Sequence, residues 1–171
     1  QEVCCFTQQD EYFNHPERDF RITDEALRIR REQHDNEAVH CCLTYKGTNN
    51  SRIGQSRREL ETRVEDEHKM RRILLALGFR SAAEVKKRRK EYKKEDLTVC
   101  LDELDGLGSY VEIEVVLPET ETGSESATEN RLREFLSELS FIRPAIEPLT
   151  YLELVMRFRG ASRAEKVSPN A

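Results

Sequence analysis

Charged side chains recur at every second position in several short segments, and this spacing constrains the fold more than any other feature of the sequence. Arg28 and Arg30, for example, alternate with Leu27 and Ile29. Successive side chains of a β-strand point to opposite faces of its sheet, so residues two apart share a face. The pattern therefore predicts strands that have one apolar face and one charged face.

The charged faces also largely segregate by sign. Arg28/Arg30 and Lys87/Arg89 are basic pairs, Glu112/Glu114 is an acidic pair, and Glu59/Glu61 is an acidic pair with Arg57 beside it on the same face. An ordinary half-exposed sheet alternates apolar and polar residues too. A solvent-facing surface more often mixes signs, because like charges on neighbouring strands repel each other. Faces of a single sign therefore suggest that a charged ligand lies between them.

A triphosphate bound together with a divalent metal would use both kinds of face. Arginine offers a forked pair of donors to phosphate oxygens. Mg²⁺ or Mn²⁺, which accompanies such a ligand, is bound by carboxylate oxygens and water. Closing the sheet would enclose both halves of the site in a tunnel, where a low dielectric strengthens each contact.

The order of the predicted elements indicates an α+β fold built on one antiparallel sheet. Strands are predicted at 2–14, 26–33, 38–46, 57–65, 83–93, 97–103 and 110–117, and helices at 66–78, about 129–140 and about 150–157. Gly78 is predicted to end the first helix, and Asp105-Gly106 to form a hairpin turn. Residues 1–157 are expected to form one domain, followed by a disordered tail at 158–171.

Composition narrows the choice of partners. Lys and Arg number 28 against 33 Asp and Glu, a net charge of −5, which argues against nucleic acid or an anionic membrane as partner. No apolar run is long enough for a transmembrane helix or a signal peptide. The five cysteines form no CxxC pair, so reduced thiols in a cytoplasmic protein are expected rather than a zinc site.

Several segments, in this order, resemble proteins of the CYTH superfamily, and more narrowly class IV adenylyl cyclases. They are DEYFNHPERDFRITDEALRIRRE (10–32), LTYKG (43–47), SRRELET (56–62), KKRRKEY (86–92), LDELDGLGSYVEIE (101–114) and LTYLEL (149–154). The resemblance spans about residues 8–156. It implies a triphosphate tunnel: a closed or nearly closed antiparallel β barrel of about eight strands in the full domain, with helices packed outside.

The resemblance also implies roles for individual residues. Those expected to bind phosphate or act in catalysis are Arg28, Arg30, Lys46, Arg57, Lys87 and Arg89. Those expected to hold Mg²⁺ or Mn²⁺ are Glu59, Glu61, Asp102, Glu112 and Glu114. Tyr12 and Tyr151 are candidates for a wall of the substrate site, although packing is the favoured explanation for Tyr12 and an equal alternative for Tyr151.

Three functions remain open on the sequence. A cyclase would turn ATP into cyclic AMP and pyrophosphate, a triphosphatase would hydrolyse inorganic, thiamine or nucleoside triphosphate, and a third alternative is a non-catalytic binder of triphosphates. The amino-acid sequence of residues 14–30 favours the cyclase. A homodimer is left open. The family's hallmark, an N-terminal strand with an ExExK pattern, has no counterpart here, so the resemblance places Gln1 after the first strand and helix.

Overall fold

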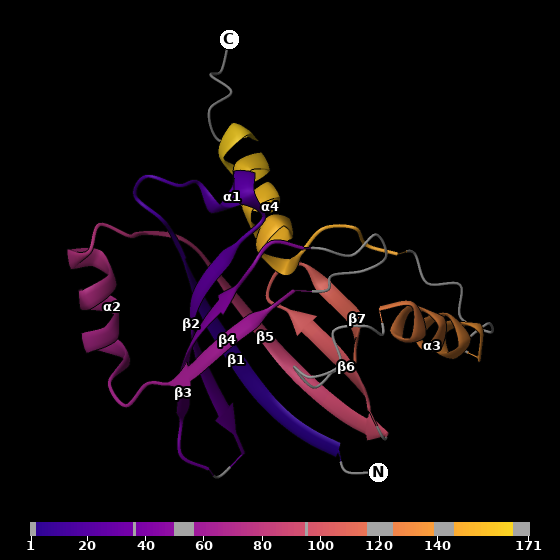
Figure 1. Ribbon diagram of the computed structural model, residues 1–171. Helices are drawn as coiled ribbons and strands as arrows, with labels where there is room; N and C mark the ends of the chain where they lie inside the picture. Colours follow the sequence, from indigo (N-terminus) through magenta and orange to yellow (C-terminus); the bar gives the residue numbers. More distant parts are fainter. Residues whose placement is uncertain are drawn as a thin grey trace.

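The computed structural model describes residues 3–35, 37–49, 57–94, 96–115, 125–138 and 146–165. Seven strands in this part of the chain form one antiparallel sheet in the order β4-β3-β2-β1-β5-β6-β7 (Figure 1). They are β1 (Val3–Asn14), β2 (Ala26–His34), β3 (His40–Lys46), β4 (Glu59–Arg63), β5 (Arg80–Lys94), β6 (Leu97–Leu104) and β7 (Gly108–Val115). The helices are α1 (Phe20–Thr23), α2 (Glu67–Ala76), α3 (Glu125–Glu138) and α4 (Tyr151–Glu165).

All seven predicted strands and all three predicted helices are present, with two differences at the level of elements. The sequence pattern missed α1, a single turn that begins after Asp19, whose side chain accepts a hydrogen bond from the Arg21 amide. The last helix does not stop near residue 157 but continues to Glu165, into the segment that was expected to be a disordered tail.

The sheet is strongly curved, and its two faces differ sharply. Along β5 the side chains of Val85, Lys87 and Arg89 are buried on the inner, concave face, while the intervening residues 86, 88 and 90 are exposed on the outer face. Strands β4 and β7 are the two edges of the sheet, and the described pairings include none between them. The antiparallel sheet is thus confirmed, whereas its closure into a barrel stays a prediction.

The outer face is covered where α2 packs against β1, β2 and β3. The buried side chains there are Phe13, Phe20, Leu27, Ile29 and Leu74. Asp66 caps the helix by accepting a hydrogen bond from the Lys69 amide. Gly78 follows the helix with φ near 90°, which confirms the predicted stop, because side chains rarely tolerate that conformation. The core on this side fixes β2 so that its arginines face inward.

Helix α4 packs against one end of the inner face, at the top of Figure 1. Val155 of α4 is buried against Tyr12 of β1 and Val85 of β5, and Tyr151 lies against the same cluster. This second, smaller core brings a residue of the C-terminal helix to the polar interior of the sheet.

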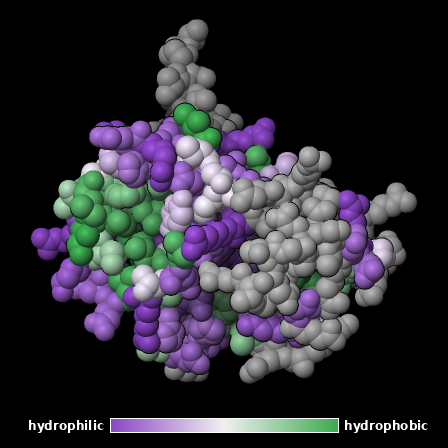
Figure 2. Space-filling model, in the orientation of Figure 1, coloured by the Kyte–Doolittle hydropathy of each residue, from purple (hydrophilic) through white to green (hydrophobic). Residues whose placement is uncertain are grey.

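Part of α2 remains apolar on the surface. Figure 2 shows an apolar patch over this helix, where Ile73, Leu75 and Leu77 are exposed. In the described part of the chain, no helix is long and apolar enough to cross a membrane. The homodimer that the sequence left open is still open.

Candidate functional site

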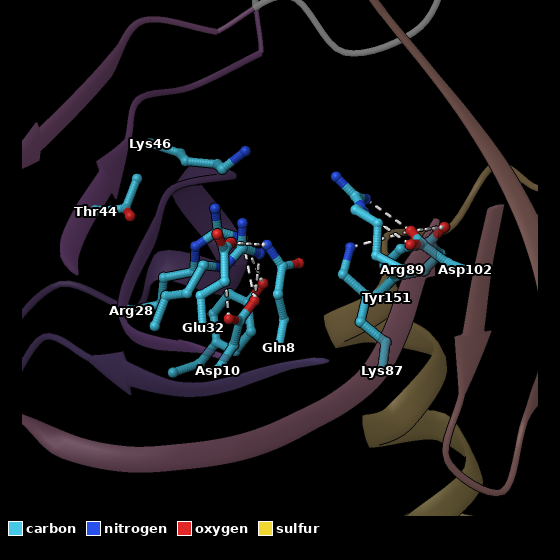
Figure 3. A network of polar contacts seen from close by, with 12 residues as sticks. Gln8, Asp10, Arg28, Glu32, Thr44, Lys46, Lys87, Arg89, Asp102 and Tyr151 are labelled. Carbon is cyan, nitrogen blue, oxygen red and sulfur yellow. Dashed lines mark hydrogen bonds and ion pairs between the residues drawn. The ribbon is translucent and has the colours of Figure 1, made fainter. Parts of the chain in front are cut away.

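The inner face carries two clusters of charged side chains, one on each side of the curved sheet (Figure 3). One cluster is built on β1 and β2, and the other on β5, β6 and α4. Both consist of two cations arranged around one buried aspartate. This arrangement is the central feature of the site.

The first cluster is centred on Asp10 of β1, which is 2% exposed. Arg30 donates two hydrogen bonds of 2.7 Å to it, from Nε to Oδ1 and from Nη2 to Oδ2. Arg28 donates from Nη1 to Oδ2 at 3.2 Å, and also lies 3.5 Å from the Tyr12 hydroxyl. Burial alone would raise the pKa of Asp10, but the hydrogen bonds from Arg30 and the charge of Arg28 lower it.

The second cluster is centred on Asp102 of β6, which is 1% exposed. Arg89 again donates two hydrogen bonds of 2.7 Å, from Nε to Oδ1 and from Nη2 to Oδ2. Lys87 donates from Nζ to Oδ2 at 3.0 Å, and the Tyr151 hydroxyl donates to the same oxygen at 2.9 Å. Burial, together with the neighbouring Arg89 charge, lowers the pKa of Lys87.

Each aspartate holds two cations in place and compensates part of their charge. A buried cation without a partner is very costly, so the aspartates make the basic pairs compatible with a folded interior. Asp102 was predicted to be a metal ligand. Because both of its oxygens are engaged by Lys87, Arg89 and Tyr151, its contacts favour a role in holding the cations.

The two walls lie close enough for their charges to interact. Lys46 of β3 forms an ion pair with Glu59. Its charge also reaches β7 at the far edge of the sheet, where it contributes to the lowered pKa of Glu112 and opposes the rise in the pKa of Glu114. Figure 3 shows the ends of Lys46 and Arg89 pointing into the gap between the two clusters. The curved sheet thus directs cations from both walls toward one central space.

Glu112 and Glu114 form a coupled pair of carboxyl groups beside Arg89. The Arg89 Nη2 atom donates to Glu112 Oε2 at 2.6 Å, and its Nη1 lies 3.6 Å from Glu114 Oε1. Burial and the hydrogen bond and charge of Glu112 raise the pKa of Glu114 to about 7. Burial would raise that of Glu112 as well, but the Glu114 hydrogen bond and the charges of Lys87 and Arg89 lower it to about 2. The pair therefore shares one proton near neutral pH.

The remaining predicted residues lie at the β3–β4 edge. Glu61 accepts a hydrogen bond of 2.8 Å from the buried Thr44 hydroxyl, and Glu59 pairs with Lys46. Arg57 does not join the clusters: its guanidinium donates to the carbonyl oxygen and side chain of Asp24, at 2.8 and 2.9 Å. These contacts tie the segment before β4 to the turn after α1.

The two predicted wall tyrosines are held in place by the clusters. Tyr12 is 8% exposed and packs against Val85 and Val155. The Tyr151 hydroxyl donates a hydrogen bond to Asp102, and the Tyr151 ring packs edge-on against Tyr110. The Lys87 ammonium lies over the Tyr151 ring, 4.8 Å from the ring centre. Both rings support the cation clusters, and Tyr12 is buried, whereas Tyr151 is half-buried.

Sequence reasoning missed two residues of the inner face, Asp10 and Gln8. Both share a face with Tyr12 because they precede it by two and four positions. The signal was therefore present, but the importance of Asp10 depends on the strand register, which sets it opposite Arg30. That register cannot be read from alternation alone.

Known proteins share this fold and much of this sequence. A Methanocaldococcus jannaschii protein described as "Putative adenylate cyclase MJ0240" is 39% identical over 147 residues, which cover 86% of this chain and 80% of that protein. The structure of the PH1819 protein from Pyrococcus horikoshii matches with a TM-score of 0.84 and 35% identity, covering 92% of this chain and 88% of that one.

A more distant solved structure shows the fold alone. It is a Hippeastrum protein described as a "putative adenylyl cyclase" with a dominant triphosphatase activity, and it has a TM-score of 0.56 and 20% identity over 93% of this chain and 84% of its own. The CYTH domain model matches residues 1–143. The chain therefore belongs to the CYTH domain family.

Proposed function

We propose that this chain is a metal-dependent enzyme that binds a triphosphate on the inner face of its sheet. The observation that carries the proposal is the pair of cation clusters on opposite walls. Each is held by a buried aspartate, and both face one space. An anion with several phosphate groups can contact both walls at once, whereas a single phosphate cannot use all of these donors.

The donors still available support an anionic ligand. Arg28 is 7% exposed, and its Nε has no hydrogen-bond partner in the part of the chain that the structure describes. A buried donor without a partner costs about 1–3 kcal/mol. A phosphate oxygen would supply that partner, and Lys46 on the neighbouring strand β3 would contribute a second positive charge.

The carboxylates on the rim fit a hard divalent cation. The described residues contain no group of three or more potential ligands already assembled around one point. Mg²⁺, however, is commonly bound by one or two carboxylates together with substrate phosphates and water. Glu112 and Glu114 would hold it in this way. When bound, the ion would offset phosphate charge and polarise the phosphorus–oxygen bonds.

The first reaction that we propose is cyclisation of ATP to cyclic AMP with release of pyrophosphate. The support is the resemblance of residues 10–32 to class IV adenylyl cyclases and the description of the M. jannaschii relative. The cations would then stabilise the charge that develops on the leaving pyrophosphate.

The second candidate is hydrolysis of a triphosphate. One observation favours it: Phe6 and Tyr12, two aromatic side chains of the inner face, are only 5% and 8% exposed and offer no stacking surface for a base. A site that recognises only the phosphates would suit inorganic or nucleoside triphosphates alike.

Product analysis with Mg²⁺ or Mn²⁺ tests both reactions. With ATP, we expect cyclic AMP and pyrophosphate in equal amounts. Orthophosphate released from ATP or from inorganic tripolyphosphate, without cyclic AMP, would establish the hydrolase instead. Tight tripolyphosphate binding without turnover would identify a binding protein. No binding of either compound would overturn the proposal.

The shared proton of the carboxyl pair predicts a pH-dependent affinity for metal. Glu114 is protonated below its pKa of about 7, and a divalent cation requires the carboxylate. Affinity for Mn²⁺ should therefore rise as the pH increases through 7 and level off above it. Titrations at pH 6 and pH 8 measure this difference, and Glu114→Gln should abolish it. An unchanged affinity across that range in the parent protein would contradict the assignment.

Loss of the proton from Glu114, which favours metal binding, should lower the stability of the fold. Because folding raises the pKa of Glu114 above its ordinary value of 4.5, the folded chain binds the proton more tightly than the unfolded chain. Without metal, the fold should therefore lose stability as the pH rises from about 4.5 through 7. Added Mn²⁺ should offset this loss above pH 7.

A further inference from the structure

Gln8 occupies the floor of the site, between the two cation clusters. It lies on β1, the central strand of the sheet, opposite Glu32 of β2 on one side and Lys87 of β5 on the other. Its side chain is on the inner face, and the residue is only 4% exposed. Neither the basic pairs nor the carboxyl pair uses it.

The orientation of the Gln8 amide is fixed by a short chain of hydrogen bonds. Its Nε2 donates to Glu32 Oε2 at 2.7 Å. The other oxygen of Glu32 lies 2.8 Å from His34 Nε2, and the His34 ring stacks on Phe6 with their centres 4.5 Å apart. Burial would raise the pKa of Glu32, but the hydrogen bonds from Gln8 and His34 lower it. Glu32 therefore remains an acceptor and holds the amide nitrogen toward itself.

The Gln8 oxygen is left as an unused acceptor. Oε1 is buried, and it has no hydrogen-bond partner among the described residues. Figure 3 shows it directed away from Glu32 and toward the space between the clusters. A phosphate oxygen would be repelled there, because an amide oxygen only accepts hydrogen bonds. The atom is suited to a ligand group that carries a proton.

We propose that Gln8 Oε1 forms a subsite for an O–H donor of the bound triphosphate complex, with Glu32 as the residue that positions it. Two sources share this chemistry: a sugar hydroxyl of a nucleotide, and the water that attacks inorganic triphosphate. This inference rests on the proposed function and identifies the part of the site that binds a hydroxyl group or water and not phosphate.

If the subsite exists, replacing Gln8 should affect some ligands and not others. A purely structural role would affect all of them alike. Gln8→Met keeps the length of the side chain and removes the acceptor, together with the Nε2 donor that bonds Glu32. The matched control is Gln9→Met, because Gln9 is the next residue on β1 and is exposed on the outer face. We expect Gln8→Met to leave the Kd for inorganic tripolyphosphate within about threefold of the parent value, since the phosphates contact the cations.

Two probes distinguish the sources of the hydroxyl. If a sugar hydroxyl occupies the subsite, Gln8→Met weakens ATP binding by about tenfold and does not weaken 2′,3′-dideoxy-ATP binding. If water occupies it, kcat for tripolyphosphate falls about tenfold while its Kd is unchanged. Glu32→Gln, which no longer fixes the amide, should reproduce either effect in part.

Other outcomes overturn the subsite. One is unchanged binding and turnover of ATP and tripolyphosphate in Gln8→Met. Another is an equal loss of affinity for tripolyphosphate, ATP and dideoxy-ATP, which would indicate a purely structural role. Failure of the parent protein to bind any of the three compounds would instead reject the proposed function, and this inference with it.

Discussion

Replacing Asp102 by Asn should lower the stability of the protein by about 3–5 kcal/mol, the cost of breaking a buried ion pair by removing one partner. The change keeps the shape of the side chain but removes its charge. Lys87 and Arg89, at 7% and 4% exposure, then lose the carboxylate that each contacts at 3.0 Å or less. For a chain of this size the melting midpoint should fall by about 10 °C, since each kcal/mol shifts it by roughly 2–4 °C.

Tripolyphosphate should restore much of that loss. In the variant the ligand would supply the negative charge that Asp102 no longer provides, so it should raise the midpoint more in Asp102→Asn than in the parent. Thermal unfolding with and without the ligand measures this difference. Glu103→Gln is the matched control, because Glu103 is the next residue on β6 and is exposed on the outer face. An equal ligand-induced shift in both proteins would contradict the view that the cations face the ligand.

Alternation in the sequence was sufficient to predict the strands and the charged face that they share. It works because a period of two is a local property, independent of which strand lies beside which. The basic pairs on β2 and β5 were therefore identified correctly as inward-facing, and so was the carboxyl pair on β7. By the same parity Lys86, Arg88 and Lys90 lie on the outer face, where they are exposed.

What alternation could not predict is which inner residues meet. Asp10 becomes the partner of Arg30 only because β1 and β2 pair in one register, and Asp102 meets Arg89 through the register of β5 and β6. Arg57 precedes β4, and its guanidinium bonds the turn at Asp24, a contact that alternation could not predict either. Contacts between distant segments decided all three positions.

The largest effect on binding should come from Arg89. Its guanidinium lies beside both Asp102 and Glu112 and points into the central space (Figure 3). Arg89→Ala should weaken tripolyphosphate binding by about tenfold to a hundredfold, because hydrogen bonds to charged groups contribute about 1.5–3 kcal/mol and about 1.4 kcal/mol corresponds to a factor of ten. Calorimetric titration with tripolyphosphate measures the change directly.

Arg88→Ala is the matched control for this variant. Arg88 is the neighbouring residue on the same strand and has the same charge, but its side chain is exposed on the outer face. The two variants therefore have the same net charge and differ only in the face that loses a cation. If general attraction to a basic strand binds the anion, both should weaken binding equally, particularly at low salt. If the inner face is the site, only Arg89→Ala should do so.

Arg89→Lys separates charge from geometry. Lysine keeps the positive charge beside Asp102, so the fold should remain stable, but it cannot donate the two parallel hydrogen bonds of a guanidinium. An affinity between those of the parent and Arg89→Ala would indicate that both charge and forked geometry contribute. An affinity equal to the parent value would mean that Arg89 acts only as a charge, and full loss with an intact fold would mean that its geometry determines how the triphosphate lies between the two walls.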